Sequence, residues 1–239
     1  MARRFCGRRS TVDTLQLTPT SKSLHKTMTQ TFQAKTLTLR DVKTKFKCQL
    51  AEEEQFFREW IDDLPEITDE EKRYLDKVKA GYANSADYPM IEDTVKMVVL
   101  APLLFLADLY LNPFHIEAEK SVELVTVDEG ILVRGSIDIL LLIESFWIVA
   151  IEGKRSQYSL EAGLPQLLCY MLSNPNPDRP TFGLLTNGSN FRFIKLIKQD
   201  TSQYALSYEF VIDRANDFYE VFRILKRLSG IISSYSTST

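Results

Sequence analysis

The sequence predicts a mixed α/β or α+β fold, in which helices lie on the faces of a sheet. Three observations support this prediction. Apolar residues recur at helical spacing up to about residue 106, they alternate with polar residues over 115–151, and Asn187-Gly188 separates two further strand-like runs. Helical and strand segments are therefore mixed along 239 residues, a length that suits one domain with appendages or two small domains.

The N-terminal part is predicted to be helical. Apolar residues at steps of three, four and seven between Thr38 and Pro65 indicate one amphipathic helix. Thr68 and Glu71 have the spacing of a capping box, so a second helix is expected over residues 69–83. The side chains expected on its buried stripe are Tyr74, Val78 and Tyr82.

A third helix is expected to begin near Ile91. It is apolar almost all round, which predicts a buried helix, and Pro102 predicts a kink. The longest apolar run covers residues 97–107, which is shorter than the ~18–20 residues that a bilayer crossing needs. No membrane segment is therefore predicted.

Three successive strands follow, over residues 115–127, 132–143 and 146–151, joined by short polar turns at 128–130 and 144–145. Joins this tight connect antiparallel neighbours, so we expect a meander. The remaining predicted elements are a helix over residues 160–173, a hairpin with strands over 181–186 and 190–197, a short strand near 204–210 and a last helix over 214–228.

Positive charge is concentrated in the first 30 residues. They carry six basic and one acidic side chain, a net charge of +5, whereas the rest carries 23 basic and 31 acidic side chains, a net charge of −8. This polar segment predicts a disordered basic tail. The alternatives are a transit-type peptide, a leader before Met28 and a nucleic-acid-binding arm. Because the body is acidic, any nucleic acid is expected to meet a local basic patch.

Several classes of site are excluded by composition. Cys6, Cys48 and Cys169 are far apart, so neither a zinc site nor a disulfide framework is expected, and a reducing cytoplasm fits this usage. With only His25 and His115, histidine-based catalysis has little support. The glycine-rich patterns of P-loop and dinucleotide-binding proteins are absent from the sequence, so no nucleotide cofactor is expected.

Asp138 interrupts an otherwise apolar strand over residues 135–142, and the next strand ends in Glu152-Gly153-Lys154. Strand alternation places Glu152 and Lys154 on one face, about 6.5–7 Å apart. Because the two strands are expected to pair, two carboxylates and an ammonium can converge. Such a cluster needs a counter-charge, and Mg²⁺ prefers oxygen ligands. A surface ion pair on a solvated strand is the alternative explanation.

This pattern resembles the PD-(D/E)XK nuclease superfamily. Asp138 is similar to the strand aspartate of that family, and Glu152 and Lys154 are similar to its Glu-x-Lys element. Gln166 and Tyr170 resemble the Gln-x-x-x-Tyr signature of the RecB-like branch.

Two further features extend the resemblance. Glu92 or Asp93 lies where many members have an additional metal-binding acid, and Thr186-Asn187-Gly188 resembles a hairpin in the N-terminal domain of type I restriction enzyme R subunits. The sequence departs from the family in having Ile137 where proline often precedes the aspartate. The resemblance covers about residues 91–197, and no counterpart is evident for residues 31–88.

The resemblance implies a restriction-endonuclease-like mixed sheet flanked by helices and Mg²⁺-dependent phosphodiester hydrolysis on DNA, with Mn²⁺ as an alternative cofactor. The implied metal ligands are Asp138, Glu152, the backbone carbonyl of Gly153, and Glu92. Lys154 would position the attacking water. Gln166 and Tyr170 would orient the lysine or contact the nucleic-acid backbone.

Three parts are thus predicted: a disordered basic tail over residues 1–30, a helical extension over 31–88 and a nuclease-like domain over 89–239. The expected partners are DNA and subunits of a restriction-modification or repair system, with no membrane. The alternative function, favoured by the acidic body, is a catalytically silent module that keeps the fold and binds DNA or assembles with such a partner.

Overall fold

The computed structural model describes residues 30–88, 90–126, 131–143, 146–152 and 159–236. The predicted tail, apart from Gln30, lies outside the described residues. So do the two predicted turns of the meander and two predicted site residues, Gly153 and Lys154.

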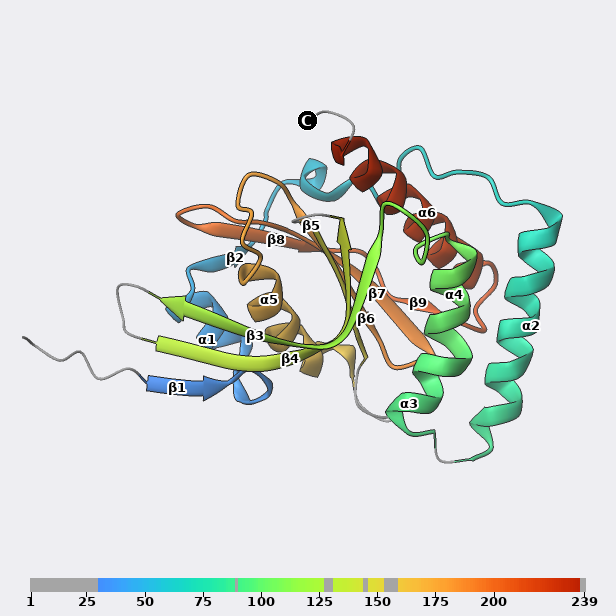
Figure 1. The fold of residues 1–239 in the computed structure, drawn as a ribbon, viewed down its shortest axis with the longest axis horizontal. Helices are drawn as coiled ribbons and strands as arrows, with labels where there is room; N and C mark the ends of the chain where they lie inside the picture. Colours follow the sequence, from blue (N-terminus) through green and yellow to red (C-terminus); the bar gives the residue numbers. More distant parts are fainter. Residues whose placement is uncertain (1–29, 89, 127–130, 144–145, 153–158, 237–239) are drawn as a thin grey trace, which may run out of the picture.

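Within these residues, one mixed sheet runs through the molecule (Figure 1). Its strands are β1 (Gln30–Gln33), β2 (Cys48–Leu50), β3 (His115–Thr126), β4 (Ile131–Ile143), β5 (Phe146–Glu152), β6 (Thr181–Thr186), β7 (Asn190–Ile197), β8 (Ser202–Leu206) and β9 (Phe210–Val211). Their order is β1-β4-β5-β6-β7-β8-β2, with β3 beside β4 and β9 beside β7. The β1–β4, β5–β6 and β2–β8 pairs are parallel and the others are antiparallel, which confirms the predicted restriction-endonuclease-like mixed fold.

The helices cover both faces of this sheet. They are α1 (Leu39–Lys45), α2 (Asp69–Ala86), α3 (Glu92–Val95), α4 (Ala101–Leu106), α5 (Leu164–Leu172) and α6 (Asp217–Ser236). One hydrophobic cluster contains residues of α1 and α5, and a second contains residues of α2, α4 and α6, in agreement with the two groups of helices in Figure 1. In the described part of the chain, no helix is long and apolar enough to cross a membrane.

The central strands are apolar on both sides. Phe182 and Leu184 of β6 lie in the cluster with α2, α4 and α6, whereas Leu185 lies in the cluster with α1 and α5. Phe193 and Ile194 of β7 divide between the clusters in the same way. Because successive strand residues point to opposite faces, both helical layers are anchored on the same strands.

The predicted meander and hairpin are confirmed. β3 pairs antiparallel with β4, and β4 pairs antiparallel with β5. β6 and β7 are joined at Asn187-Gly188, where Gly188 has a φ of 89°. Glycine adopts this left-handed conformation without the steric penalty of a side chain.

The single helix expected between residues 38 and 65 is wrong. α1 ends at Lys45, Lys47 has a φ of 48°, and the next residues form β2, which pairs in parallel with the distant β8. Since β1 pairs with β4 in the same way, residues 31–88 contribute to the sheet and are more than a helical extension. The boundary at residue 88 stays a prediction.

α2 begins with the predicted capping box. The Thr68 hydroxyl accepts the Glu71 N–H at 3.1 Å, and the Glu71 carboxylate accepts the Thr68 N–H at 2.6 Å. Tyr82 is buried as expected, but Tyr74 is 51% exposed and Leu75 is buried instead. The prediction for Tyr74 is wrong because α2 packs against α6 and the segment before α4 in such a way that Leu75, and not Tyr74, faces the core.

The third helix is present in three parts, because a π-helical turn at Lys96–Leu100 joins α3 to α4. The expectation that it is buried almost all round is wrong: Met97 and Phe105 are 73% and 70% exposed. Only one side of this segment faces the core. The helical geometry does change next to Pro102, which lies in the first turn of α4.

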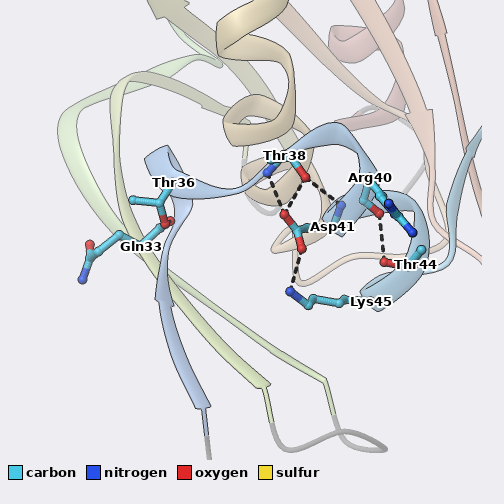
Figure 2. Close-up of polar contacts among 7 residues, drawn as sticks. All are labelled: Gln33, Thr36, Thr38, Arg40, Asp41, Thr44 and Lys45. Atoms are coloured by element: carbon cyan, nitrogen blue, oxygen red, sulfur yellow. Dashed lines mark hydrogen bonds and ion pairs between the residues drawn. The ribbon is translucent and has the colours of Figure 1, made fainter.

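Polar contacts at its N-terminus stabilise α1 (Figure 2). The Thr38 hydroxyl accepts the Asp41 N–H at 3.2 Å, and the Asp41 carboxylate accepts the Thr38 N–H at 2.9 Å, so α1 also begins with a capping box. Lys45 Nζ donates to the same carboxylate at 2.6 Å. The preceding helical turn, Ala34–Thr36, brings Ala34 against the middle of β4.

Candidate functional site

Residues 135–138 of β4 lie beside a gap in the sheet. On the edge of β4 away from β3, β1 pairs with residues 131–134 and β5 pairs with residues 139–143. Among the described residues, no strand pairs with 135–138 on that edge. The backbone of this short stretch is therefore reached by side chains instead of a neighbouring strand.

Tyr170 of α5 fills the gap. Its side chain is 2% exposed, and its hydroxyl accepts hydrogen bonds from the Ser136 backbone amide and from Gln166 Nε2, the latter at 2.9 Å. Burial raises the pKa of Tyr170, the bonds from Gln166 and Ser136 oppose that rise, and the nearby Asp138 carboxylate adds to it. Tyr170 therefore stays protonated at neutral pH and holds Gln166 beside the strand that carries Asp138.

At the level of Asp138, the side chains of β3 and β4 switch from one face of the sheet to the other. Ile137 lies in the cluster with α5, whereas Ile139 packs against the opposite cluster, although alternation would place both on one face. Glu119 of β3 lies opposite Asp138 and has a φ of 52°. The residues before and after Glu119 pair with the residues after and before Asp138. This irregularity places Asp138 where the two faces of the sheet meet.

Asp138 consequently lines two pockets. The larger, of about 570 Å³, is polar and includes Lys35, Arg134 and Gln166. The smaller, of about 420 Å³, lies toward α3 and α4 and is lined mainly by apolar side chains, with Lys96 at its polar side. Asp138 thus stands between a polar and an apolar recess.

α3 brings further carboxylates to this point. Lys96 Nζ lies 3.7 Å from Asp138 Oδ1, 3.4 Å from Glu92 Oε1 and 3.7 Å from Asp93 Oδ1. Glu92 and Asp138, two predicted metal ligands, therefore approach the same ammonium group. Lys96 was not among the residues predicted for the site, although its spacing of four from Glu92 places the two side chains on one helix face.

The end of β5 lies level with Asp138. Ala150 pairs with Ile139 of β4, and Glu152 pairs with Thr186 of β6. The backbone of Glu152 thus reaches the part of the sheet that contains Asp138. The roles predicted for Glu152, Gly153 and Lys154 stay predictions, as do those of Gln166 and Tyr170.

The donor chemistry at Asp138 fits a hard divalent cation, since its neighbours are carboxylates that already attract one positive charge. Within the described residues, however, no three acidic, histidine or cysteine side chains lie together in a way that holds a metal ion. Completion of a metal site therefore depends on the predicted ligands at Glu152 and Gly153.

Cysteine chemistry has no support in the described residues. Cys48 and Cys169 are buried, unpaired thiols, and burial raises the pKa of each to about 12. A thiol that stays protonated at neutral pH is a poor nucleophile. The candidate site therefore consists of oxygen and nitrogen groups around Asp138.

The comparison with protein families agrees with this geometry. The family described as the type I restriction enzyme R protein N terminus matches residues 16–202, which is most of the chain. The chain belongs to this family. No curated protein matches the chain.

Membership in this R-protein family confirms the resemblance inferred from the sequence and is consistent with a PD-(D/E)XK nuclease-like domain. The match also includes β1, α1, β2 and α2, for which the sequence pattern offered no counterpart. α6 lies beyond the matched residues but packs in the core against the sheet.

Proposed function

We propose that this R-protein N-terminal domain hydrolyses phosphodiester bonds of DNA with the help of a divalent cation, as part of a restriction-modification system. The observation that carries this proposal is the position of Asp138. It lies at the break in the β3–β4 pair, between two pockets, beside the acidic residues of α3 and level with the end of β5.

Mg²⁺ is the proposed cofactor, and Mn²⁺ is its expected substitute. The proposed ligands are Asp138, Glu152, the Gly153 carbonyl and Glu92. When bound, the cation supplies a Lewis acid for the phosphate and a more acidic water molecule. The carboxylate of Asp138 is the ligand best supported by the geometry, because it borders both pockets.

The remaining predicted residues position the substrate and the water. Lys154 is proposed to orient the attacking water and to stabilise charge on the phosphate. Gln166 is proposed to contact the DNA backbone or the lysine, and Tyr170 to hold Gln166 in place. The 2.9 Å hydrogen bond between Gln166 Nε2 and the Tyr170 hydroxyl supports this division of roles.

DNA and other subunits of a restriction-modification enzyme are the proposed partners. Lys35 and Arg134 line the larger pocket and provide local positive charge for a phosphate backbone. Arg134 Nε also bonds Glu123 Oε1 at 2.8 Å, so its guanidinium is held at the rim. Glu123 and Asp138 line the same pocket, so the local basic patch expected on the acidic body stays a prediction.

A cleavage assay tests the proposal. Linear, circular and single-stranded DNA are incubated with wild type and Asp138→Asn in Mg²⁺, Mn²⁺ or EDTA, with Asp178→Asn as an exposed control of equal charge change. We expect metal-dependent cleavage that Asp138→Asn abolishes. Lys154→Ala should lower it by ~10²-fold or more, the size expected for one positioned catalytic group.

Two results would contradict a nuclease at this site. Cleavage that survives Asp138→Asn in protein free of contaminating nuclease would place the chemistry elsewhere. DNA binding without metal-dependent cleavage by wild type would instead support the catalytically silent module.

A further inference from the structure

Lys96 lies at the meeting point of three carboxylates from two elements. Glu92 and Asp93 precede it by four and three residues on one helical segment, and Asp138 approaches from β4. The Lys96 side chain is only 20% exposed, so its charge is partly removed from water. A partly buried ammonium is stable there because negative charge surrounds it.

The three contacts are long. At 3.4–3.7 Å, each exceeds the 2.7–2.9 Å of a charge-assisted hydrogen bond. By contrast, Lys226 Nζ lies 2.6 Å from Glu71 Oε1, in an ion pair that ties α6 to α2. None of the three carboxylates around Lys96 therefore holds it as tightly as Glu71 holds Lys226.

The local backbone also differs from a regular helix at this residue. Lys96 is the first residue of the π-helical turn that ends at Leu100. Such turns often occur at functional sites, because they change the direction of side chains on one helix face. Here the turn begins with the residue that lies toward Asp138.

We infer that Lys96 is an internal counter-ion that neutralises this acidic cluster until a divalent cation binds, and that the cation displaces it. The inference rests on the metal site of the proposed function. Mg²⁺ binds oxygen ligands at 2.0–2.1 Å, so at full occupancy it would take the carboxylate oxygens of Asp138 and Glu92 that now face the Lys96 ammonium group. The released Lys96 side chain would remain at the smaller pocket, which it already lines.

Titration of Mg²⁺ alone, followed by calorimetry, tests this competition. Lys96→Met keeps the length of the side chain and removes its charge, and it should bind Mg²⁺ about tenfold more tightly than wild type. Lys96→Arg keeps the charge and should remain within about twofold of wild type. Lys72→Met removes an exposed lysine that also pairs with an acid on its own helix, and it should not change the affinity.

A second measurement uses unaltered sequence, so it does not depend on the folding of a variant. In wild type carrying ¹³C-dimethylated lysines, the NMR signal of Lys96 should shift as Mg²⁺ saturates the protein, while that of Lys72 should stay in place. An unchanged Lys96 signal at saturation would overturn the inference.

The outcomes separate this inference from the proposed function. If wild type and Lys96→Met bind Mg²⁺ equally well, or if the variant binds more weakly, the counter-ion role is wrong and the metal site stands. If neither protein binds Mg²⁺, the metal site and the counter-ion role are both wrong.

Discussion

Gly135 lies directly against the hydroxyl of Tyr170. A β-carbon added at residue 135 would be 2.4 Å from Tyr170 Oη and 2.9 Å from the Ala34 side chain. Tyr170, the tyrosine of the Gln-x-x-x-Tyr pattern, therefore packs tightly against β4, and the contact lies three residues before Asp138. This contact explains why a glycine interrupts an apolar strand at this position.

Gly135→Ala should be strongly destabilising. The new methyl group cannot fit unless Tyr170 or Ala34 moves, and overpacking of this kind costs about 1–3 kcal/mol. We expect the melting temperature to fall by about 2–12 °C, measured by differential scanning calorimetry. Gly230→Ala is the matched control: nothing lies within 4 Å of a β-carbon added at Gly230, and alanine favours the helix, so stability should not fall.

Tyr170→Phe tests the hydroxyl itself. The variant keeps the ring but removes the acceptor for the Ser136 amide and for Gln166 Nε2, and an unpaired buried donor costs about 1–3 kcal/mol. We expect a lower free energy of unfolding in urea and weaker DNA cleavage, since Gln166 loses its partner. Equal stability of the two proteins would show that the hydroxyl does not hold this edge of β4.

Gly188, in the turn of the predicted hairpin, packs against Val95 of α3, the residue before Lys96. Its φ is 89°, and an added β-carbon would lie 2.7 Å from Val95 Cγ1. Gly188→Ala should therefore strain the turn and push α3, with a loss of about 1–3 kcal/mol and weaker Mg²⁺ binding. Gly81→Ala meets Val98 at an ordinary 3.7 Å inside α2, so it should be neutral or stabilising. Similar urea midpoints for both variants would contradict this account.

Asp41 provides a test by pH. Its pKa is strongly lowered from the ordinary value of 3.8, chiefly by the hydrogen bond from Lys45 and then by those from Thr38 (Figure 2). A group with a lowered pKa in the folded state stabilises the fold above its unfolded pKa, and this contribution disappears as the pH falls toward the folded value.

Asp41→Asn should accordingly lower stability by about 1 kcal/mol at neutral pH, the usual size of a lost capping interaction. The difference from wild type should shrink as the pH falls from about 4 to about 2. Chemical unfolding at several pH values measures it, with the exposed Asp200→Asn as control. A difference that stays constant over this range would mean that the Asp41 charge does not contribute.

Local sequence determined most of the sheet. The alternation of apolar and polar residues over β3, β4 and β5 was enough to predict these strands, and Asn187-Gly188 imposes a turn because glycine accepts a positive φ. The Thr68–Glu71 capping box is also local, because both of its partners lie within one helical turn. The pattern of Asp138, Glu152 and Lys154 suggested the family for the same reason, because its residues are close together in the sequence.

Only the tertiary structure decided which elements meet across long sequence distances. β1 and β2 are short, and their parallel partners, β4 and β8, are remote, so nothing in their own residues distinguishes them from loops or helix. The burial of Leu75 in place of Tyr74 was set by packing against α6. Likewise, Lys96 lies beside Asp138 because α3 is packed next to the irregularity at Glu119, and such proximity depends on the folding of several separate segments.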